Sequence, residues 1–312
     1  MKKTLLIAGF AGLMSTTAMA QNVAVSMANS DNFLTVLRNG MDAYAKTIDG
    51  LSLQIEIADD DVGKQLSQVQ NFIASGVDAI IVNPVDTSAT QALTDAAAAA
   101  NIPLVYVNRQ PINVDKLPDN QAFVASNEVE SGTLETQEIC RLLKAAGKTE
   151  ANVYVMMGDL SNQAAVQRTA DIHDVIATPE CSFIKIIDEQ TATWSRDQAQ
   201  NLMTNWITAG TPYDAVIANN DEMAIGAIQA MKAAGVDMST MIVGGIDATQ
   251  DALVAMQAGD LDVTVFQDAA GQGAGAVNAA IALTKGEAVE QKVYIPFQLV
   301  TPANIGDFLS KN

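Results

Sequence analysis

The sequence predicts an α/β protein with two Rossmann-like lobes, each built around a parallel sheet and joined to the other by a three-segment hinge. The chain has 312 residues, whereas one hydrophobic core rarely grows beyond about 250–300 residues, so two domains are expected. Short apolar runs rich in β-branched residues alternate with stretches in which apolar residues recur at helical spacing. Repeated βαβ units of this kind form parallel sheets that are covered by helices on both faces.

Two series of these elements follow one another along the chain. The first contains strands at residues 23–27, 51–57, 79–82 and 104–107, with helices at 33–44, at 66–73 and up to residue 100. The second contains strands at 153–157, 183–187, 215–218 and 241–245, with helices at 163–175, 197–207 and 222–234. Beyond them we expect a strand at 263–267, a small-residue helix at 269–283 and a last strand at 293–297.

The order of the elements predicts that the chain crosses between the lobes three times. The stretch 120–132 lies between the two series, and the chain is expected to return to the first lobe after residue 267. The N-terminal lobe would comprise residues 21–125 and 268–294, and the C-terminal lobe residues 126–267 and 295–312. A few residues at the ends of elements can absorb the backbone changes of closure, so these crossings would act as a hinge.

The charge of the chain limits its partners. Acidic side chains outnumber basic ones by 36 to 17, which gives a formal net charge of -19. Such a charge argues against nucleic acid or an anionic membrane surface as a partner. Hydrophobic residues make up 49% of the chain and charged residues 17%, which excludes an intrinsically disordered protein.

The first 20 residues are predicted to be a cleaved signal peptide. Lys2 and Lys3 form a basic start, an apolar stretch follows at 5–14, and an A-x-A cleavage site lies at 18–20. Residue 21 is glutamine rather than the cysteine that would indicate a lipid anchor. We therefore expect a soluble protein that is exported to a bacterial periplasm.

Cys140 and Cys181 are the two cysteines of the chain. In an oxidising compartment they can form one disulfide. Two buried thiols are the alternative, because Cys140 lies on the apolar side of a predicted helix. The pair lacks the close spacing of metal ligands, and the single histidine, His173, is expected on the surface of a helix among polar neighbours. The sequence therefore predicts neither a metal nor a cofactor.

Polar residues directly after the predicted strands form the candidate ligand site. In open parallel sheets, ligands bind beyond the carboxyl ends of the strands. Amide, guanidinium and carboxylate groups recur at these positions, and they suit a small neutral ligand with many hydroxyl groups, since each hydroxyl can both donate and accept. The residues are Asn83, Asn108, Arg109, Asn219, Asn220, Asp247 and Gln267.

Two aromatic residues and a further arginine join this set. Phe33 and Trp194 lie near the starts of helices that follow strands, where they either pack in the core or form flat walls against a ring. Arg109 and Arg168 each either face the cleft or lie on the surface. Asn83 precedes a proline, so a turn-forming role is its alternative. Asp221 is expected to be the N-cap of the helix that follows it, with ligand contact as the alternative.

Motifs of hydrolases and nucleotide-binding enzymes do not occur in the sequence. It contains no G-x-S-x-G elbow, no G-x-x-x-x-G-K-S/T loop and no H-E-x-x-H helix. The glycine-rich stretch 271–275 lacks the G-x-G-x-x-G spacing and is interpreted as close helix packing, with phosphate binding as the alternative. Three consecutive aspartates at 59–61 are interpreted as a solvated loop. A secreted glycoside hydrolase stays as the alternative function.

Four strings carry a resemblance to a known family, namely VDAIIVNP at 77–84, VNRQ at 107–110, NDEMA at 220–224 and GGID at 244–247. With them the mature chain resembles the periplasmic sugar-binding proteins of the ribose-binding type, which have the type I periplasmic binding protein fold. The resemblance implies a monomer without enzymatic activity that serves as the substrate-binding component of an ABC importer. It would close on one sugar and deliver it to a membrane permease, and presentation to a chemoreceptor is an alternative role.

The resemblance also implies a set of ligand contacts and a branch of the family. Asn108 stands where ribose-binding relatives commonly have an aspartate, and Asp31 brings a carboxylate toward the cleft unless it only caps the first helix. With Trp194, these features resemble the inositol and inosamine (rhizopine) branch, which favours a cyclitol or its amino derivative over a monosaccharide. Carried over by position, the implied contacts are Phe33, Asn83, Asn108, Arg109, Arg168, Trp194, Asn220, Asp247 and Gln267.

Overall fold

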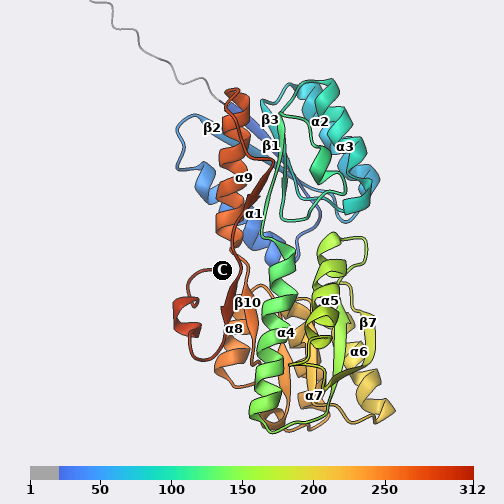
Figure 1. The fold of residues 1–312 in the computed structure, drawn as a ribbon. Coiled ribbons are helices and arrows are strands. Elements are labelled where there is room, and N and C mark those ends of the chain that lie inside the picture. Colours follow the sequence, from blue (N-terminus) through green and yellow to red (C-terminus); the bar gives the residue numbers. More distant parts are fainter. Residues whose placement is uncertain (1–20) are drawn as a thin grey trace, which may run out of the picture.

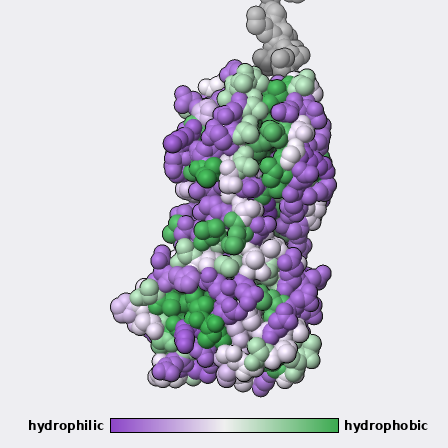
Figure 2. Space-filling view, turned by 90° about the vertical axis from the view of Figure 1, so that its right-hand side faces the viewer, coloured by the Kyte–Doolittle hydropathy of each residue, from purple (hydrophilic) through white to green (hydrophobic). Residues whose placement is uncertain are grey.

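The computed structural model describes residues 21–312, so the predicted signal peptide at residues 1–20 lies outside the described residues. Two α/β lobes lie end to end, with the crossing segments between them (Figure 1). Hydrophilic residues dominate the face shown in Figure 2, and hydrophobic residues form separate patches on it. Within residues 21–312, no helix has the length and apolar character to span a membrane.

The N-terminal lobe contains a six-stranded parallel sheet in the order β11-β5-β4-β3-β1-β2. Its strands are β1 (Gln21–Met27), β2 (Leu51–Ile57), β3 (Ala79–Val82), β4 (Leu104–Val107), β5 (Gln121–Ala125) and β11 (Lys292–Tyr294). Its helices are α1 (Asn32–Ala45), α2 (Val62–Ser75), α3 (Gln91–Ala99) and α9 (Ala269–Thr284). Ile81 and Val105 pack with α1 and α9, whereas Ile80 and Leu104 pack with α2 and α3. Because helices cover both faces, β3 and β4 are apolar at every position.

The C-terminal lobe contains a four-stranded parallel sheet in the order β7-β6-β8-β9. Its strands are β6 (Ala151–Met157), β7 (Ile184–Thr191), β8 (Ala215–Ala218) and β9 (Ile242–Gly244). On one face lie α4 (Glu128–Ala145) and α5 (Gln163–Ile176), and on the other lie α6 (Arg196–Ala209), α7 (Asp221–Ala233) and α8 (Gln250–Gln257). Two isolated bridges join this sheet to β10 (Thr264–Phe266), which pairs antiparallel with β12 (Gln298–Val300). The predicted α/β fold with two lobes and parallel sheets is confirmed, apart from this one antiparallel pair.

Short 3₁₀ helices lie at Thr87–Ala89, Val114–Lys116, Met238–Thr240 and Ile305–Asp307. Three short segments connect the two lobes: residues 126–127 between β5 and α4, 267–268 between β10 and α9, and 295–297 between β11 and β12. The two sheets are thus built from interleaved parts of the chain, as Figure 1 shows by the red and orange elements in both lobes.

Two element predictions need correction. The stretch 120–132, to which the sequence analysis assigns no helix or strand, forms β5 and the start of α4, because the apolar residues at 122–125 are buried beside β4. Only residues 293 and 294 of the predicted strand at 293–297 lie in a strand, the end of β11, and an interruption at 295–297 separates them from β12 in the other lobe. Pro296 stands at the interruption, where it cannot donate a backbone hydrogen bond to a strand ladder. The sequence interpretation also contained no counterpart of α8.

Helix α9 packs closely against α1 through its small residues. A Cβ atom on Gly273 would lie 2.9 Å from the backbone nitrogen of Met41, and one on Gly40 would lie 3.0 Å from the Cα of Ala270. The glycine-rich stretch 271–275 is therefore a close helix contact, as predicted. The aspartates at 59–61 lie in an exposed loop, also as predicted, and Asp61 caps α2.

Cys140 on α4 and Cys181 after α5 form a disulfide, and their Cα atoms lie 5.8 Å apart. This bond decides between the two alternatives that the sequence left open, and it lies within the C-terminal lobe. His173 is exposed on α5, and its Nε2 lies 2.8 Å from a carboxylate oxygen of Glu189. The prediction of a surface histidine is confirmed. Among residues 21–312, no cluster of His, Cys, Asp and Glu is arranged to hold a metal ion.

Candidate ligand-binding site

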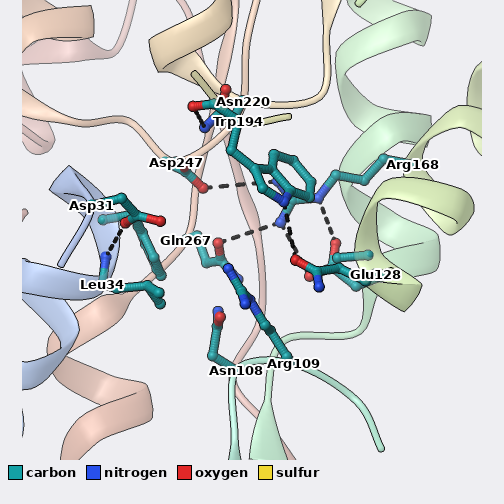
Figure 3. Close-up of a pocket in the computed structure, with 13 residues that line it drawn as sticks. Asp31, Leu34, Asn108, Arg109, Glu128, Arg168, Trp194, Asn220, Asp247 and Gln267 are labelled. Carbon is teal, nitrogen blue, oxygen red and sulfur yellow. Dashed lines mark hydrogen bonds and ion pairs between the residues drawn. The ribbon is translucent and has the colours of Figure 1, made fainter. Parts of the chain in front are cut away.

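A cavity lies between the lobes, beyond the carboxyl ends of their strands. It is lined by side chains of both lobes, as expected for a small-molecule site between two domains. Figure 3 shows side chains from elements far apart in the sequence pointing into the same space. Nine of the ten predicted ligand residues line the cavity: Asp31, Phe33, Asn108, Arg109, Arg168, Trp194, Asn220, Asp247 and Gln267.

Asn83, the tenth predicted residue, does not line this cavity. It is fully buried behind it, where Oδ1 accepts a hydrogen bond from the backbone nitrogen of Ala28 at 3.3 Å. Its Nδ2 lies 3.2 Å from the carbonyl oxygen of Val107 and 3.3 Å from Oδ1 of Asn108 and donates to both. The expectation of direct ligand contact is therefore corrected, because the amide of Asn83 is occupied in orienting Asn108.

Four lining residues were not predicted: Leu34, Glu128, Asn162 and Ala164. Glu128 begins α4, within the stretch 120–132 that lies between the two predicted series of elements. Asn162 lies at the N-cap of α5, five residues after β6 ends at Met157. The strand-end rule covers only residues that directly follow a strand. A search of the first turn of each following helix would have found both residues.

Arg168 is buried, which excludes the surface alternative. Its Nε and Nη2 donate to the two carboxylate oxygens of Glu128 at 2.7 and 3.1 Å, and Nη1 donates to the carbonyl oxygen of Asn219 at 2.7 Å. Burial acts to lower the pKa of Arg168, but the charge and hydrogen bonds of Glu128 outweigh it, so the pKa is raised. The guanidinium also lies between Trp194 and Asp247 (Figure 3). It is thus a fixed cation at the edge of the cavity.

Arg109 is also buried, but it has fewer protein partners than Arg168. Its Nη1 donates to the carbonyl oxygens of Pro84 and Val85 at 3.0 and 3.4 Å. Burial lowers its pKa, and nearby carboxylates, chiefly Asp31, oppose this effect. Since its guanidinium lines the cavity, its remaining N–H groups are available to a ligand.

Phe33 and Trp194 provide two aromatic walls. Phe33 belongs to the apolar cluster around α1 and also lines the cavity, so both alternatives for it apply. The indole Nε1 of Trp194 donates to Oδ1 of Asn162 at 3.0 Å, and the ring lies 5.6 Å from the guanidinium carbon of Arg168. A Cβ atom on Gly158 would overlap this ring. The indole therefore needs a glycine at position 158.

Two lining carboxylates, Asp31 and Asp247, are poorly satisfied by protein donors. Oδ1 of Asp31 accepts a hydrogen bond from the backbone nitrogen of Leu34 at 2.7 Å, so Asp31 caps α1 and also lines the cavity. Asp247 makes no side-chain hydrogen bond with residues 21–312, and its Oδ1 lies 3.9 Å from Nη1 of Arg168. Burial raises the pKa of Asp31, and it raises the pKa of Asp247 well above the ordinary value although Arg168 opposes the shift. Both groups have room for hydrogen-bond donors from a ligand.

Asn220, and not Asp221, is the N-cap of α7, which corrects the prediction for Asp221. Oδ1 of Asn220 accepts a hydrogen bond from the backbone nitrogen of Met223 at 3.0 Å. Asp221 is fully buried away from the cavity, where it accepts hydrogen bonds from Oγ1 of Thr264 at 2.7 Å and from the backbone nitrogen of Thr249 at 2.8 Å. Burial raises the pKa of Asp221 to about 7.

Three lining residues have a left-handed backbone: Asn108 with φ 67°, Trp194 with φ 65° and Asp247 with φ 123°. Each such conformation costs about 1–3 kcal/mol and persists only where the surrounding structure enforces it. Strain of this kind concentrates at functional sites. Of the eight non-glycine residues with positive φ among residues 21–312, these three line the cavity, and Thr193 and Ala248 adjoin it in sequence.

The chemistry of the lining suits binding. Three carboxylates, two guanidinium groups and four amides line the cavity within residues 21–312, beside the two aromatic rings. Serine, cysteine and histidine are not part of this lining. The arrangement can hold a hydroxyl-rich ring, with its rim on the polar groups and its C–H faces against the aromatic walls.

Two lobes of the type I periplasmic binding protein fold, with such a cavity between them, define a class of binding proteins. The chain belongs to the periplasmic binding protein domain family, whose sequence pattern matches residues 23–288. It is 63% identical to a putative rhizopine-binding protein of Rhizobium meliloti over the full length of both chains. It is 33% identical to a xylitol-binding protein of Mycolicibacterium smegmatis, over 95% of this chain and 81% of that one.

A solved structure has the same fold. It is an ABC transporter solute binding protein from Bacillus halodurans with bound myo-inositol. The TM-score is 0.88 and the identity 40%, with 96% of this chain and 100% of that chain covered. The resemblance found in the sequence is thus confirmed for the family and the fold.

Proposed function

We propose that this protein is the periplasmic substrate-binding component of an ABC importer and that its ligand is a polyhydroxylated ring. The meeting of nine predicted polar and aromatic residues on one cavity between the lobes carries the proposal. The rhizopine-binding, xylitol-binding and inositol-bound relatives support the same class of ligand. The basic and apolar pattern of residues 1–20 supports export, and a membrane permease would receive the ligand.

Ligand binding would proceed by lobe closure. Arg168, Trp194 and Asp247 lie on the C-terminal lobe, whereas Asp31 and Arg109 lie on the N-terminal lobe. A ligand bound first to one lobe gains the contacts of the other lobe only when the two come together. This difference in contacts shifts the population from open to closed.

Within this class of ligand, the charges of the cavity favour a cyclitol or its amino derivative. Glu128 pairs with Arg168 through two hydrogen bonds, so it neutralises that guanidinium. Among the lining residues, Arg109 is then the one cation left to balance the charges of two carboxylates, Asp31 and Asp247. Hydroxyl donors satisfy such carboxylates, and an ammonium group also balances their charge, because a buried charge is costly unless it is paired. An inosamine is therefore our first choice of ligand, followed by an inositol.

Calorimetric titration with myo-inositol, scyllo-inosamine, xylitol and D-ribose tests the ligand class. We expect the two cyclitols to bind more tightly than xylitol and ribose. Arg109→Ala and Asp247→Ala should keep the fold and weaken binding by about 10- to 150-fold, since hydrogen bonds to charged groups contribute about 1.5–3 kcal/mol. Asp251→Ala is the control, because Asp251 pairs with Arg196 on the surface. Unchanged affinity in both cavity variants would refute the assignment of this site.

The charge argument has its own test. Asp31→Asn and Asp247→Asn keep a hydrogen-bond acceptor but remove the negative charge. Both variants should weaken the binding of the inosamine more than that of the inositol. An equal loss for the two ligands would show that these carboxylates act only as acceptors, and it would remove the preference for an amine.

A hydrolase would behave differently on the same panel. Chromogenic glycosides should remain intact on prolonged incubation with the purified protein, since we propose binding without chemistry. Release of the chromophore that disappears in Asp247→Ala would instead establish the glycoside hydrolase alternative.

A further inference from the structure

Asn162 uses its side chain differently from most asparagines at a helix N-cap. Asparagine at this position commonly accepts a hydrogen bond from the first turn of its own helix, but Asn162 makes no such bond with α5. The residue is only 2% exposed. Its Oδ1 accepts a hydrogen bond from the indole Nε1 of Trp194 at 3.0 Å, and its Nδ2 donates to the carbonyl oxygen of Val85 at 3.1 Å.

Val85 follows β3 in the opposite lobe, so Asn162 joins a wall of the cavity to the contact between the lobes. The same carbonyl oxygen accepts a hydrogen bond from Nη1 of Arg109 at 3.4 Å. A line of hydrogen bonds thus runs from Trp194 through Asn162 and Val85 to Arg109. Both ends of this line are side chains that line the cavity.

Thr87, also from the N-terminal lobe, caps α5 across the gap. Its Oγ1 accepts a hydrogen bond from the backbone nitrogen of Gln163 at 3.1 Å and donates to the carbonyl oxygen of Ser161 at 3.0 Å. The backbone nitrogen of Thr87 donates to the same oxygen at 3.1 Å. The first N–H groups of a helix have no partner within the helix. The opposite lobe therefore supplies the cap that the side chain of Asn162 does not.

We propose that Asn162 is a positioning residue that alternates between two sets of hydrogen bonds and thereby couples the Trp194 wall to lobe closure. In the closed protein, Asn162 holds the indole ring at the cavity and is itself held by Val85. When the lobes separate, Val85 and Thr87 move away, Asn162 turns back to cap α5, and the indole ring loses its acceptor. This inference rests on the proposed function, because it concerns the wall of the same cavity.

The coupling has a direct consequence for binding. A contact that is complete only in the closed state shifts the population toward that state, whereas a contact equal in both states shifts nothing. Trp194 would therefore contribute to closure as well as to affinity. Since one hydrogen bond contributes modestly, the expected effects are about 2- to 10-fold.

Three variants separate the parts of this line. Asn162→Ala removes the side-chain hydrogen bonds to Trp194 and Val85, together with a local one to Oγ of Ser161. Trp194→Phe removes the indole donor but keeps an aromatic ring. Thr87→Val removes the cross-lobe cap with almost no change of shape, and residue 87 is not part of the cavity lining. Asn71→Ala, at an exposed position on α2, is the control.

The first measurement needs no ligand. Single-molecule energy transfer between dyes on the two lobes counts the closed fraction, which should fall about 2- to 10-fold in Asn162→Ala and in Thr87→Val and stay unchanged in Asn71→Ala. Equal closed fractions in the wild type and Asn162→Ala would overturn the proposal.

Acrylamide quenching then reports on Trp194, because the second tryptophan, Trp206, is stacked on Tyr154 and only 5% exposed. Quenching should increase in Thr87→Val, although residue 87 lies on the other lobe. A purely structural role of Thr87 would leave the exposure of Trp194 as it is, and that result would also overturn the proposal.

The third measurement is a double-mutant cycle on the dissociation rate of myo-inositol. Asn162→Ala and Trp194→Phe should each raise the rate, and the double variant should raise it no further than the stronger single variant. Independent effects would contradict the line of hydrogen bonds. If the wild type does not bind myo-inositol while the ligand-free results hold, the proposed ligand is wrong and the coupling stands.

Discussion

Reduction of the Cys140–Cys181 disulfide should lower the melting temperature of the C-terminal lobe by about 8–16 °C. The two cysteines are separated by 41 residues in the sequence. Closing a loop of this length removes about 13 cal/mol/K of entropy from the unfolded chain, which corresponds to about 4 kcal/mol at 25 °C. For a folding unit of about 150–250 residues, each kcal/mol changes the melting temperature by about 2–4 °C.

Thermal unfolding monitored by circular dichroism, with and without a phosphine reductant, measures this shift. The Cys140→Ala/Cys181→Ala variant should melt at the temperature of the reduced wild type and should not respond to the reductant. Affinity for the ligand should stay the same, because neither cysteine lines the cavity. A shift below about 2 °C, or a response of the double variant to the reductant, would refute this reasoning.

Three further predictions follow from buried contacts. Burial raises the pKa of Asp221 to about 7, whereas an aspartate in the unfolded chain titrates near pH 4. The stabilisation by protonated Asp221 is therefore complete below about pH 4 and is lost as the pH rises to about 7. In urea titrations, the Asp221→Asn variant should lose less stability than the wild type between these two pH values. Gly273→Ala overpacks the contact between α1 and α9 and should cost about 1–3 kcal/mol in the same assay, whereas Gly306→Ala has open space and should be neutral. Glu128→Ala leaves Arg168 buried without its carboxylate and should cost about 3–5 kcal/mol; a loss below 1 kcal/mol would contradict the pairing.

The parts of the fold that follow from local pattern were predictable from the sequence. The strand at 79–82 has the predicted limits, because a buried parallel strand must be apolar on both faces and Asn83-Pro84 ends it. The cavity lining was largely predictable for a related reason. Parallel strands end at a common edge, so Asn220 after β8 and Asp247 after β9 could be expected at one site although they are far apart in the sequence.

The remaining features depend on tertiary contacts that no local pattern records. Asn83 lies at a strand end like its neighbours, but it is turned inward because Asn108 and the carbonyl oxygen of Val107 need its amide. Glu128 is recognisable only once Arg168 is known to lie beside it. Asn162 gains its role from Val85, a residue of the opposite lobe. Such roles require the position of one lobe on the other.

The two lobes contribute unequally to the cavity. Eight of its thirteen lining residues come from the chain between positions 126 and 267, and these include Glu128, Arg168 and Trp194. A chimera that keeps the C-terminal lobe and takes its N-terminal lobe from a relative should keep its ligand selectivity, whereas its affinity should change. Selectivity and affinity could then be adjusted separately, by evolution or in the engineering of a biosensor.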